Sequence, residues 1–252
     1  MMCNSGRICR TVKWDRLKAA GTFAWIAIVL SFGLDGTPAQ QPDAAAVIRG
    51  IDASVQSRFE NVLGFTAIEH YAVFRGQDET HPAAEMTVKD IYRKGAGKTY
   101  EIQSRSGSSL ILHFGLQPLL DNEQEINLPG NVEKSWFTSA NYDMKPQLGA
   151  SVKVDGRDCV AVAVTARRAA PNTINGTIWV DAKDGSLVQI QGVATKSASA
   201  LTGATNMMRQ YVQVDGFSMA THARAESNSS LIGRSVVVID YSNYQMELKA
   251  GK

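Results

Sequence analysis

The sequence has little cysteine and no marked excess of charge of either sign. Of its 252 residues only three are cysteine, and 26 Lys and Arg residues against 24 Asp and Glu residues give a net charge of +2. This balance gives no electrostatic case for nucleic-acid binding. Hydrophobic residues make up 44% of the chain, which is enough for a globular domain to bury a core without disulfides.

Recognised catalytic and metal-binding patterns are also missing. The histidines His70, His81, His113 and His222 are isolated from one another, and no pair has the spacing of a zinc site. The sequence contains no Gly-x-Ser-x-Gly elbow and no Ser-x-x-Lys motif. We therefore predict a protein that is not an enzyme and that needs no metal or cofactor.

One short motif imitates a phosphate-binding loop. Residues 95–99 read GAGKT, like the end of that loop. The full motif needs a glycine at the position of Tyr92 and a helix after the lysine. Because residues 100–102 continue with the composition of a strand, we expect a β-turn at this point rather than a nucleotide site.

The first 39 residues have the order of a secretory signal peptide. Residues 7–18 hold five basic side chains, residues 19–34 are apolar, and residues 37–39 are small. This order predicts export and cleavage after Ala39; an uncleaved N-terminal anchor is the alternative. We expect residues 40–46 to form a disordered lead and residues 47–252 to form a single domain.

Removal of the signal peptide would also remove two of the three cysteines. Cys3 and Cys9 lie within it, which leaves Cys159 in an apolar alternating run. A single cysteine cannot form an internal disulfide. We expect Cys159 to be a buried structural residue, because no histidine is near it in the sequence to activate a thiolate.

Hydrophobic periodicity predicts one helix followed by many strands. Apolar residues recur at helical spacing over residues 48–62, which favours an amphipathic helix. Alternating runs predict strands over residues 65–74, 86–92, 99–104 and 236–244, and further strands from residue 152 onward. Residues 110–120 are apolar without strict alternation, so they are expected to form a short helix or an irregular segment. The class is α+β, mainly β, with a largely antiparallel sheet.

The clearest local pattern is a hairpin over residues 176–197. Two β-branched runs flank Asp184-Gly185, and glycine supplies the positive φ that tight turns need. We expect the turn to lie in solvent. Either Trp179 or the face carrying Ile178 and Val180 points inward, because a shift of one residue would exchange the two faces.

Aromatic residues are spread over most of the predicted strands. A curved antiparallel sheet that does not close leaves an apolar concavity, which a helix laid across it converts into a pocket for acyl chains. The candidate wall residues of such a pocket are Phe65, Tyr92, Tyr100, Phe114, Trp136, Trp179 and Tyr211. We expect Trp136 or Trp179 to lie close to a bound chain.

Several patterns resemble the LolA/LolB-like superfamily of periplasmic lipoprotein carriers and outer-membrane lipoprotein-sorting proteins. They are a helix leading into FTAIEHY (65–71), IWVD (178–181) before LVQI (187–190), VDGF (214–217) and VVVIDYSNY (236–244). The resemblance covers about residues 47–248. The first loops and the insertion over residues 110–136 depart from the carrier, and no residue here maps onto a known carrier contact.

The resemblance implies an unclosed antiparallel β-half-barrel with helices covering its concave face. It further implies a non-enzymatic periplasmic binder of acyl chains, either a lipoprotein carrier in transport or a lipid-binding protein. Its partners would be lipid acyl chains or a lipoprotein, with an envelope protein as a further partner. Neither nucleic acid nor a spanning segment in the mature chain is expected. The alternative is an envelope sensor or protein-interaction module of the same fold with a filled core.

Overall fold

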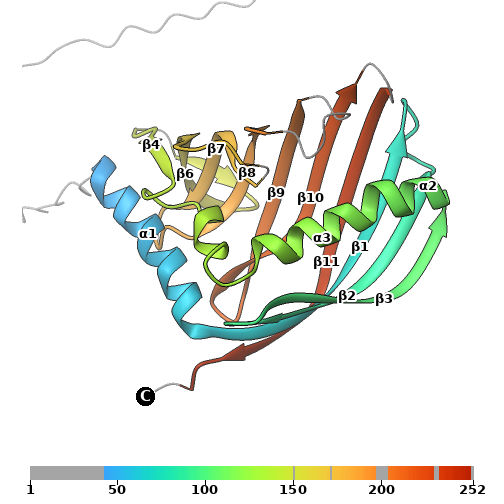
Figure 1. Cartoon of the computed structure of the whole chain (residues 1–252). Helices are drawn as coiled ribbons and strands as arrows, with labels where there is room; N and C mark the ends of the chain where they lie inside the picture. The colour runs from blue at the N-terminus through green and yellow to red at the C-terminus, as the bar shows by residue number, and fades with distance from the viewer. Residues whose placement is uncertain (1–42, 150, 171, 197–203, 230–232, 251–252) are drawn as a thin grey trace, which may run out of the picture. The chain divides into compact units, whose positions relative to one another are not determined.

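The structure is a computed structural model, and it describes residues 43–149, 151–170, 172–196, 204–229 and 233–250. The whole predicted signal peptide, residues 1–39, and residues 40–42 of the expected disordered lead therefore lie outside the described residues. Those that are described belong to one compact unit, Gln41–Lys252, shown in Figure 1. Among them, no helix is both long enough and apolar enough to cross a membrane.

Strands dominate this unit, as predicted. The helical segments are α1 (Ala44–Asn61), α2 (Ser109–Ile111), the π-helical turn η1 (Leu112–Leu116), α3 (Gln117–Ile126) and the 3₁₀ turn η2 (Val132–Ser135). The strands are β1 (Val62–Arg75), β2 (Ala84–Arg93), β3 (Gly97–Gly107), β4 (Tyr142–Pro146), β5 (Val152–Val154), β6 (Arg157–Ala166), β7 (Ile174–Asp181), β8 (Leu187–Ala194), β9 (Thr205–Val214), β10 (Phe217–Ser229) and β11 (Gly233–Leu248).

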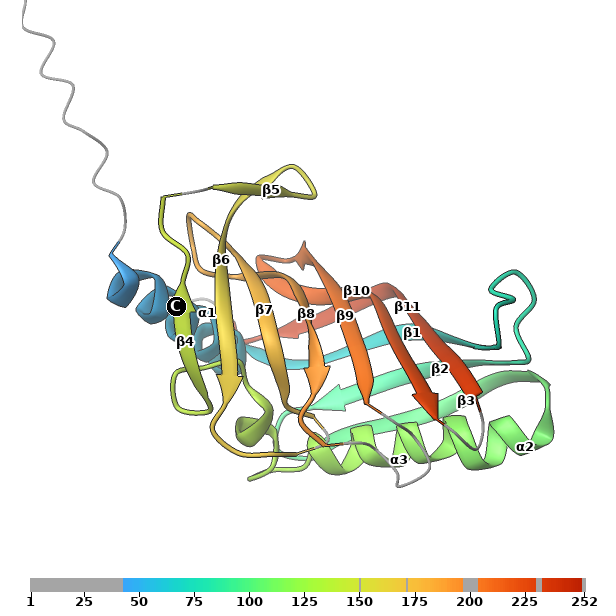
Figure 2. The same ribbon diagram turned by 90° about the horizontal axis from the view of Figure 1, so that it is seen from above.

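The described strands form one antiparallel sheet of eleven strands, in the order β3-β2-β1-β11-β10-β9-β8-β7-β6-β4, with β5 paired to β6. The first and last strands of the chain meet in its middle, where Tyr71 of β1 lies opposite Ile239 of β11. The edge strands β3 and β4 do not pair with each other in the described part, so the sheet is not closed into a barrel. Helices lie across its concave face (Figures 1 and 2). The predicted fold class is confirmed.

Helix α1 covers one end of the sheet. Asp43 caps it, with its side-chain oxygen accepting a hydrogen bond from the Ala46 backbone N–H at 2.6 Å, and such a cap fixes a helix start. The predicted helix is thus confirmed, but it starts at Ala44, so the last residues of the expected disordered lead are helical. Its inner face buries Val47 and Ile51 against β4, β6, β7 and β8.

The insertion after β3 covers the other end of the sheet. The segment α2–η1–α3 is helical over residues 109–126, which decides between the two structures expected there. Pro118 is tolerated because it stands in the first turn of α3. Leu116 and Leu120 are buried against side chains of β1 and β2, among them Tyr71 and Met86.

The hairpin of β7 and β8 is confirmed, and its orientation is now determined. Ile178 and Val180 are buried in the core under α1, so Trp179 lies on the opposite face of the sheet. The expectation that its turn lies in solvent is wrong at Gly185. This residue has a φ of +71°, and a Cβ there would overlap the backbone of Gly50 in α1. The hairpin turn and the helix therefore pack backbone to backbone.

The lone cysteine of the predicted mature chain is also placed. Cys159 is fully buried on β6 as a free thiol, and burial raises the pKa of this thiol. A raised pKa keeps the group protonated and unreactive at neutral pH. The expectation of a structural cysteine is confirmed.

Candidate functional site: a cavity between two helical covers

The two helical covers leave the middle of the concave face uncovered. A cavity of about 680 Å³ lies there, between α1 on one side and α3 on the other, with strands β8 to β11 beneath it. In Figure 2 these strands run from the region of α1 toward α3. The volume lies within the roughly 300–1,000 Å³ typical of small-molecule sites.

Small side chains in β10 help to create this space. Ala220, Ala223 and Ala225 all line the cavity, and the register places Ala223 between Arg209 of β9 and Ile239 of β11. The neighbouring strands present much larger side chains to the same face. The row of alanines on β10 between these larger side chains leaves open space above the sheet. The backbone of β10 remains hydrogen-bonded, because this strand pairs with both β9 and β11.

Aromatic rings form much of the wall near α1. Phe59 of the helix and Trp136 have ring centroids 4.7 Å apart. Phe65 lies against Tyr92 at 5.2 Å and against Tyr244 at 5.9 Å. All five rings line the cavity, and such tilted and offset contacts are favourable between aromatic side chains.

Four of the seven candidate wall residues line the cavity: Phe65, Tyr92, Trp136 and Tyr211. The other three do not. Phe114 is 71% exposed on η1, because its position in the turn points away from the leucines that pack on the sheet. Trp179 lies on the opposite face of its strand. Tyr100 is directed toward Glu123 of α3, to which its hydroxyl donates a hydrogen bond at 3.2 Å.

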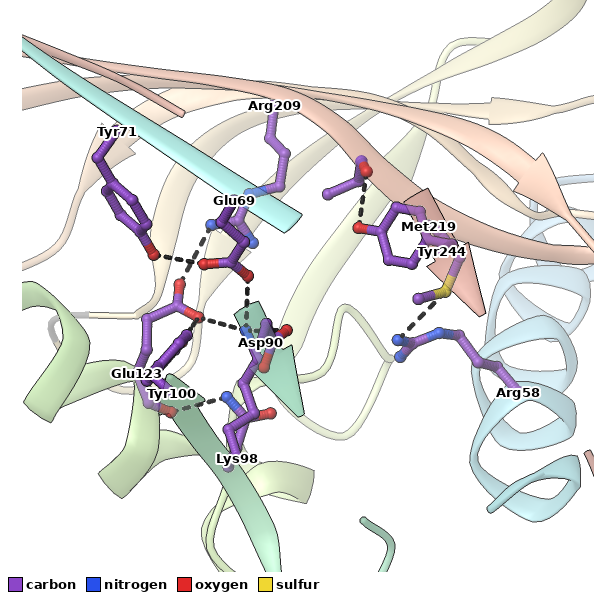
Figure 3. Close-up of polar contacts among 12 residues, drawn as sticks. Arg58, Glu69, Tyr71, Asp90, Lys98, Tyr100, Glu123, Arg209, Met219 and Tyr244 are labelled. Atoms are coloured by element: carbon purple, nitrogen blue, oxygen red, sulfur yellow. Dashed lines mark hydrogen bonds and ion pairs between the residues drawn. The ribbon is translucent and has the colours of Figure 1, made fainter. Parts of the chain in front are cut away.

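The largest departure from the sequence-based picture is a cluster of buried charges on the α3 side of the cavity, drawn in Figure 3. Its centre is the ammonium group of Lys98, whose side chain is only 8% exposed. The ammonium lies 3.1 Å from a carboxylate oxygen of Glu69, and 3.0 Å from one of Asp90 and one of Glu123. We call these four residues the charge cluster.

Tyrosine hydroxyls and one arginine complete the polar contacts of the charge cluster. The Tyr71 hydroxyl donates to Glu69 at 2.5 Å, and the Arg209 guanidinium lies 3.8 Å from Glu123. Because Glu123 belongs to α3, while Lys98 and Glu69 belong to the sheet, these contacts connect the helix to the sheet. Buried carboxylates and ammonium groups need such partners to remain charged.

The pKa shifts follow from this geometry. Burial alone would raise the pKa of Glu123, but Lys98 and Arg209 outweigh it and lower the pKa to about 2. Burial would likewise lower the pKa of Lys98, whereas the carboxylates, led by Glu123, raise it well above its ordinary value. At neutral pH these two groups therefore form an ion pair.

Asp90 behaves differently. Burial raises its pKa to about 7, Lys98 offsets only part of this rise, and the nearby Glu69 adds to it. Its Oδ1 atom is buried and has no hydrogen-bond partner among the described residues. The charge cluster thus holds a carboxyl group that takes up a proton near neutral pH.

A signal for the charge cluster was present in the strand alternation. Glu69 stands between Ala67 and Tyr71 on the buried face of β1, and Asp90 follows Val88 on that of β2. A charged residue in register with buried apolar ones predicts a buried polar site. The sequence analysis did not identify this site, because spacing alone does not show which charged residues meet across a sheet.

An arginine lies on the α1 side of the cavity. Arg58 of α1 lines the wall, and its Nη2 atom approaches the sulfur of Met219 at 3.6 Å. Figure 3 shows Arg58 apart from the charge cluster, on the side of Met219 and Tyr244. No carboxylate pairs with Arg58 within the described ranges.

The histidines lie outside the cavity wall. His70 lies 3.3 Å from Glu85 and His222 lies 2.7 Å from Asp240, and all four of these side chains are partly exposed. No group of three or more potential metal ligands occurs in the part of the chain that the structure describes.

No family model matches the chain, and no curated protein matches it. Several solved structures are similar to it. One is a DUF1329 family protein from Desulfovibrio piger, with 16% identity and a TM-score of 0.41, covering 84% of this chain and 95% of that one.

Two further structures carry names that the sequence patterns suggested. A LolA superfamily protein from Nitrosomonas europaea is 12% identical, with a TM-score of 0.43 and coverage of 81% of this chain and 93% of that one. The domain of a putative outer membrane lipoprotein-sorting protein from Vibrio parahaemolyticus is 13% identical, with a TM-score of 0.45 and coverage of 80% and 93%. Because these sequence identities and TM-scores are low, the similarities say nothing about function, for which the evidence is the cavity itself. The structures similar to this chain thus include a member of the LolA superfamily, which the sequence patterns resemble.

Proposed function

We propose that this chain is a non-enzymatic binder of acyl chains that acts in the periplasm as a lipid-binding protein or lipoprotein carrier. The observation that carries the proposal is the cavity of about 680 Å³ between α1 and α3, with its aromatic wall and alanine floor. The location is supported by the order of basic, apolar and small residues in positions 1–39.

The apolar walls supply the binding energy. Burying a methylene group contributes about 0.8 kcal/mol, so an enclosed run of ten contributes roughly 8 kcal/mol before ordering costs. A net binding free energy near that value corresponds to a dissociation constant of about 1 μM. This force is nearly non-directional, so the site needs shape and apolar surface rather than a sharp sequence motif.

The charge cluster is the feature from which a catalytic hypothesis would start, because Asp90, Lys98 and Glu123 have shifted pKa values and line the cavity. Its contacts favour a structural role. Lys98 forms ion pairs with three carboxylates, and its ion pair with Glu123 connects α3 to the sheet. We interpret the cluster as the polar anchor that holds α3 at the edge of the cavity.

The test is a titration of delipidated protein with saturated fatty acids of increasing length, followed by tryptophan emission. We expect saturable binding that tightens as the chain lengthens. Trp136 lines the cavity and Trp179 does not, so Trp136→Phe should abolish most of the emission change, while Trp179→Phe should preserve it. No saturable response at any chain length would refute the proposal.

A variant that fills the cavity provides the second arm. Ala223→Phe places a large side chain on the floor, opposite Arg209 and Ile239, and we expect it to weaken binding at least tenfold. The matched control is Val212→Phe in β9, since Val212 is 43% exposed and not part of the wall. Equal affinities of the two variants would place the ligand elsewhere.

The other candidate function is a protein-interaction module. Strand β3 is an edge of the sheet, and its Ile102 is 41% exposed, so a partner strand could pair there. The filled core that this alternative assumed does not match the cavity between the helices. A folded protein that fails to bind every fatty acid would make this function the better supported one.

A further inference from the structure

Arg58 is a cation placed in an apolar wall without a counter-ion. Its Nε atom is buried and has no hydrogen-bond partner in the described structure. Its one hydrogen-bond contact, through Nη2, is with the thioether sulfur of Met219, and sulfur is a weak acceptor. The guanidinium thus has donors that nothing in the cavity satisfies.

Among the described residues, no carboxylate pairs with the charge of Arg58. Burial lowers the pKa of Arg58, and the groups that act against this are the hydroxyls of Tyr211, Tyr92 and Tyr244 rather than a carboxylate. Arginine nevertheless stays protonated in proteins. Arg58 as a whole is partly exposed, but its buried Nε donor without a partner is unfavourable, so the free protein presents a site for an anion.

Most other cations that line the cavity have carboxylate partners among the described residues. Lys98 already contacts three carboxylates, Arg209 lies 3.8 Å from Glu123, and Arg224 pairs with Glu79 and Glu226. Lys196 also lines the cavity, but it is an exposed residue that water solvates. Arg58 stands apart from them, at the α1 side. An anionic group entering the cavity would therefore pair with Arg58 and avoid the carboxylates of the charge cluster.

We propose that the cavity selects amphiphiles with an anionic head, a carboxylate or a phosphate, which Arg58 binds while the chain lies along the apolar floor. This inference rests on the proposed acyl-chain binding and adds the class of head group. Guanidinium groups suit both anions, because their paired N–H donors match two oxygens of either one.

The test compares three ligands with the same twelve-carbon chain, namely dodecanoate, dodecyl phosphate and 1-dodecanol, titrated calorimetrically at pH 8 below their aggregation limits. We expect one or both anions to bind the wild-type chain about tenfold or more tightly than the alcohol does. The reason is that an anion, unlike the alcohol, forms a charge-assisted hydrogen bond with Arg58. Arg58→Gln should remove this preference and leave binding of the alcohol unchanged. Whichever anion binds more tightly identifies the head group.

Arg49→Gln is the matched control, because Arg49 is an exposed arginine of the same helix and its removal changes the net charge equally. It should retain the preference for anions. Arg58→Lys, which keeps the charge but loses the paired donors, should bind with intermediate affinity. Thermal unfolding of each variant verifies that it is folded, and Arg58→Gln should be at least as stable as the wild type.

The outcomes separate this inference from the proposed function. Equal affinity of the wild type for anion and alcohol, or an unchanged preference in Arg58→Gln, would overturn the role of Arg58 and leave acyl-chain binding intact. A preference lost equally in Arg49→Gln would show a general charge effect and would also overturn it. Failure of all three ligands to bind would overturn both proposals.

Discussion

Replacing Lys98 by methionine tests the interpretation of the charge cluster most severely. The variant keeps an unbranched side chain one atom shorter than lysine, but it leaves Glu69, Asp90 and Glu123 without the cation that contacts all three at 3.0–3.1 Å. The first two carboxylates have side chains that are only 1% exposed. Removing one partner of a buried ion pair lowers the free energy of unfolding by about 3–5 kcal/mol, and we expect a loss in this range at pH 8.

Urea denaturation followed by circular dichroism measures this loss, because urea is uncharged and does not screen ion pairs. The control is Lys89→Met on the other face of β2. Lys89 is 40% exposed and lies 3.9 Å from Glu101, and a surface pair of this kind contributes about 0–1 kcal/mol. A loss for Lys98→Met within about 1 kcal/mol of that for Lys89→Met would refute the buried-anchor interpretation.

The pH dependence of the same variant has a defined sign. Without Lys98, burial raises the pKa values of the cluster carboxylates above those in the unfolded chain, so the folded state binds more protons. The stability of Lys98→Met should therefore rise as the pH falls, and its deficit relative to wild type should be smaller at pH 5 than at pH 8. Adding Glu69→Gln to the variant removes one unpaired carboxylate and should restore part of the lost stability.

Two further substitutions test single features of the fold. Asp90 has a pKa of about 7 in the folded chain against 3.8 as its ordinary value, so the wild type loses stability as the pH rises through this window. Asp90→Asn should match wild type near pH 4 and exceed it at pH 8, by up to about 4 kcal/mol; equal stabilities at pH 8 would contradict the raised pKa. Gly185→Ala should destabilise the chain more than Gly156→Ala in thermal unfolding. Both glycines have positive φ, but only Gly185 meets backbone, that of Gly50, so equal losses would contradict the close packing of hairpin and helix.

The sequence predicted the elements of this fold well, because their signals are local. Helical spacing identified α1, and alternation identified β1, β2, β3 and β11, all of which depend on a few neighbouring residues. The Asp-Gly pairs at 155–156 and 215–216 are turns with positive φ at both residues. Local steric preference largely determines such positions.

The cavity could be predicted only in outline. Phe65, Tyr92, Trp136 and Tyr211 do line it. Which face of a strand points inward depends on register, and this is why the sequence did not show that Trp179 lies outside the cavity. Phe114 lies outside the cavity for a different reason. Its segment is helical, and rotation of a helix about its axis is set by packing against the sheet, which the sequence of an isolated insertion does not specify.

The polar part of the site could not have been assembled from spacing alone. Glu123 lies within the insertion, for which the sequence allowed a short helix or an irregular segment, and its contact with Lys98 requires α3 to fold back over β3. The role proposed for Arg58 could not be predicted from spacing either. Its position in α1 is that of an ordinary helix residue, and only the absence of a carboxylate around it in the folded chain, as far as the structure describes it, makes it a candidate for binding an anion.

The most direct test of acyl-chain binding is native mass spectrometry of the protein purified without detergent from the cells that produce it. We expect a species heavier than the polypeptide, whose extra mass is lost on denaturation and is identified by extraction as a lipid or a lipid-modified peptide. Ala223→Phe, purified in the same way, should carry less of it. A wild-type protein that yields only the bare chain, under conditions that preserve a known lipid complex, would contradict the account.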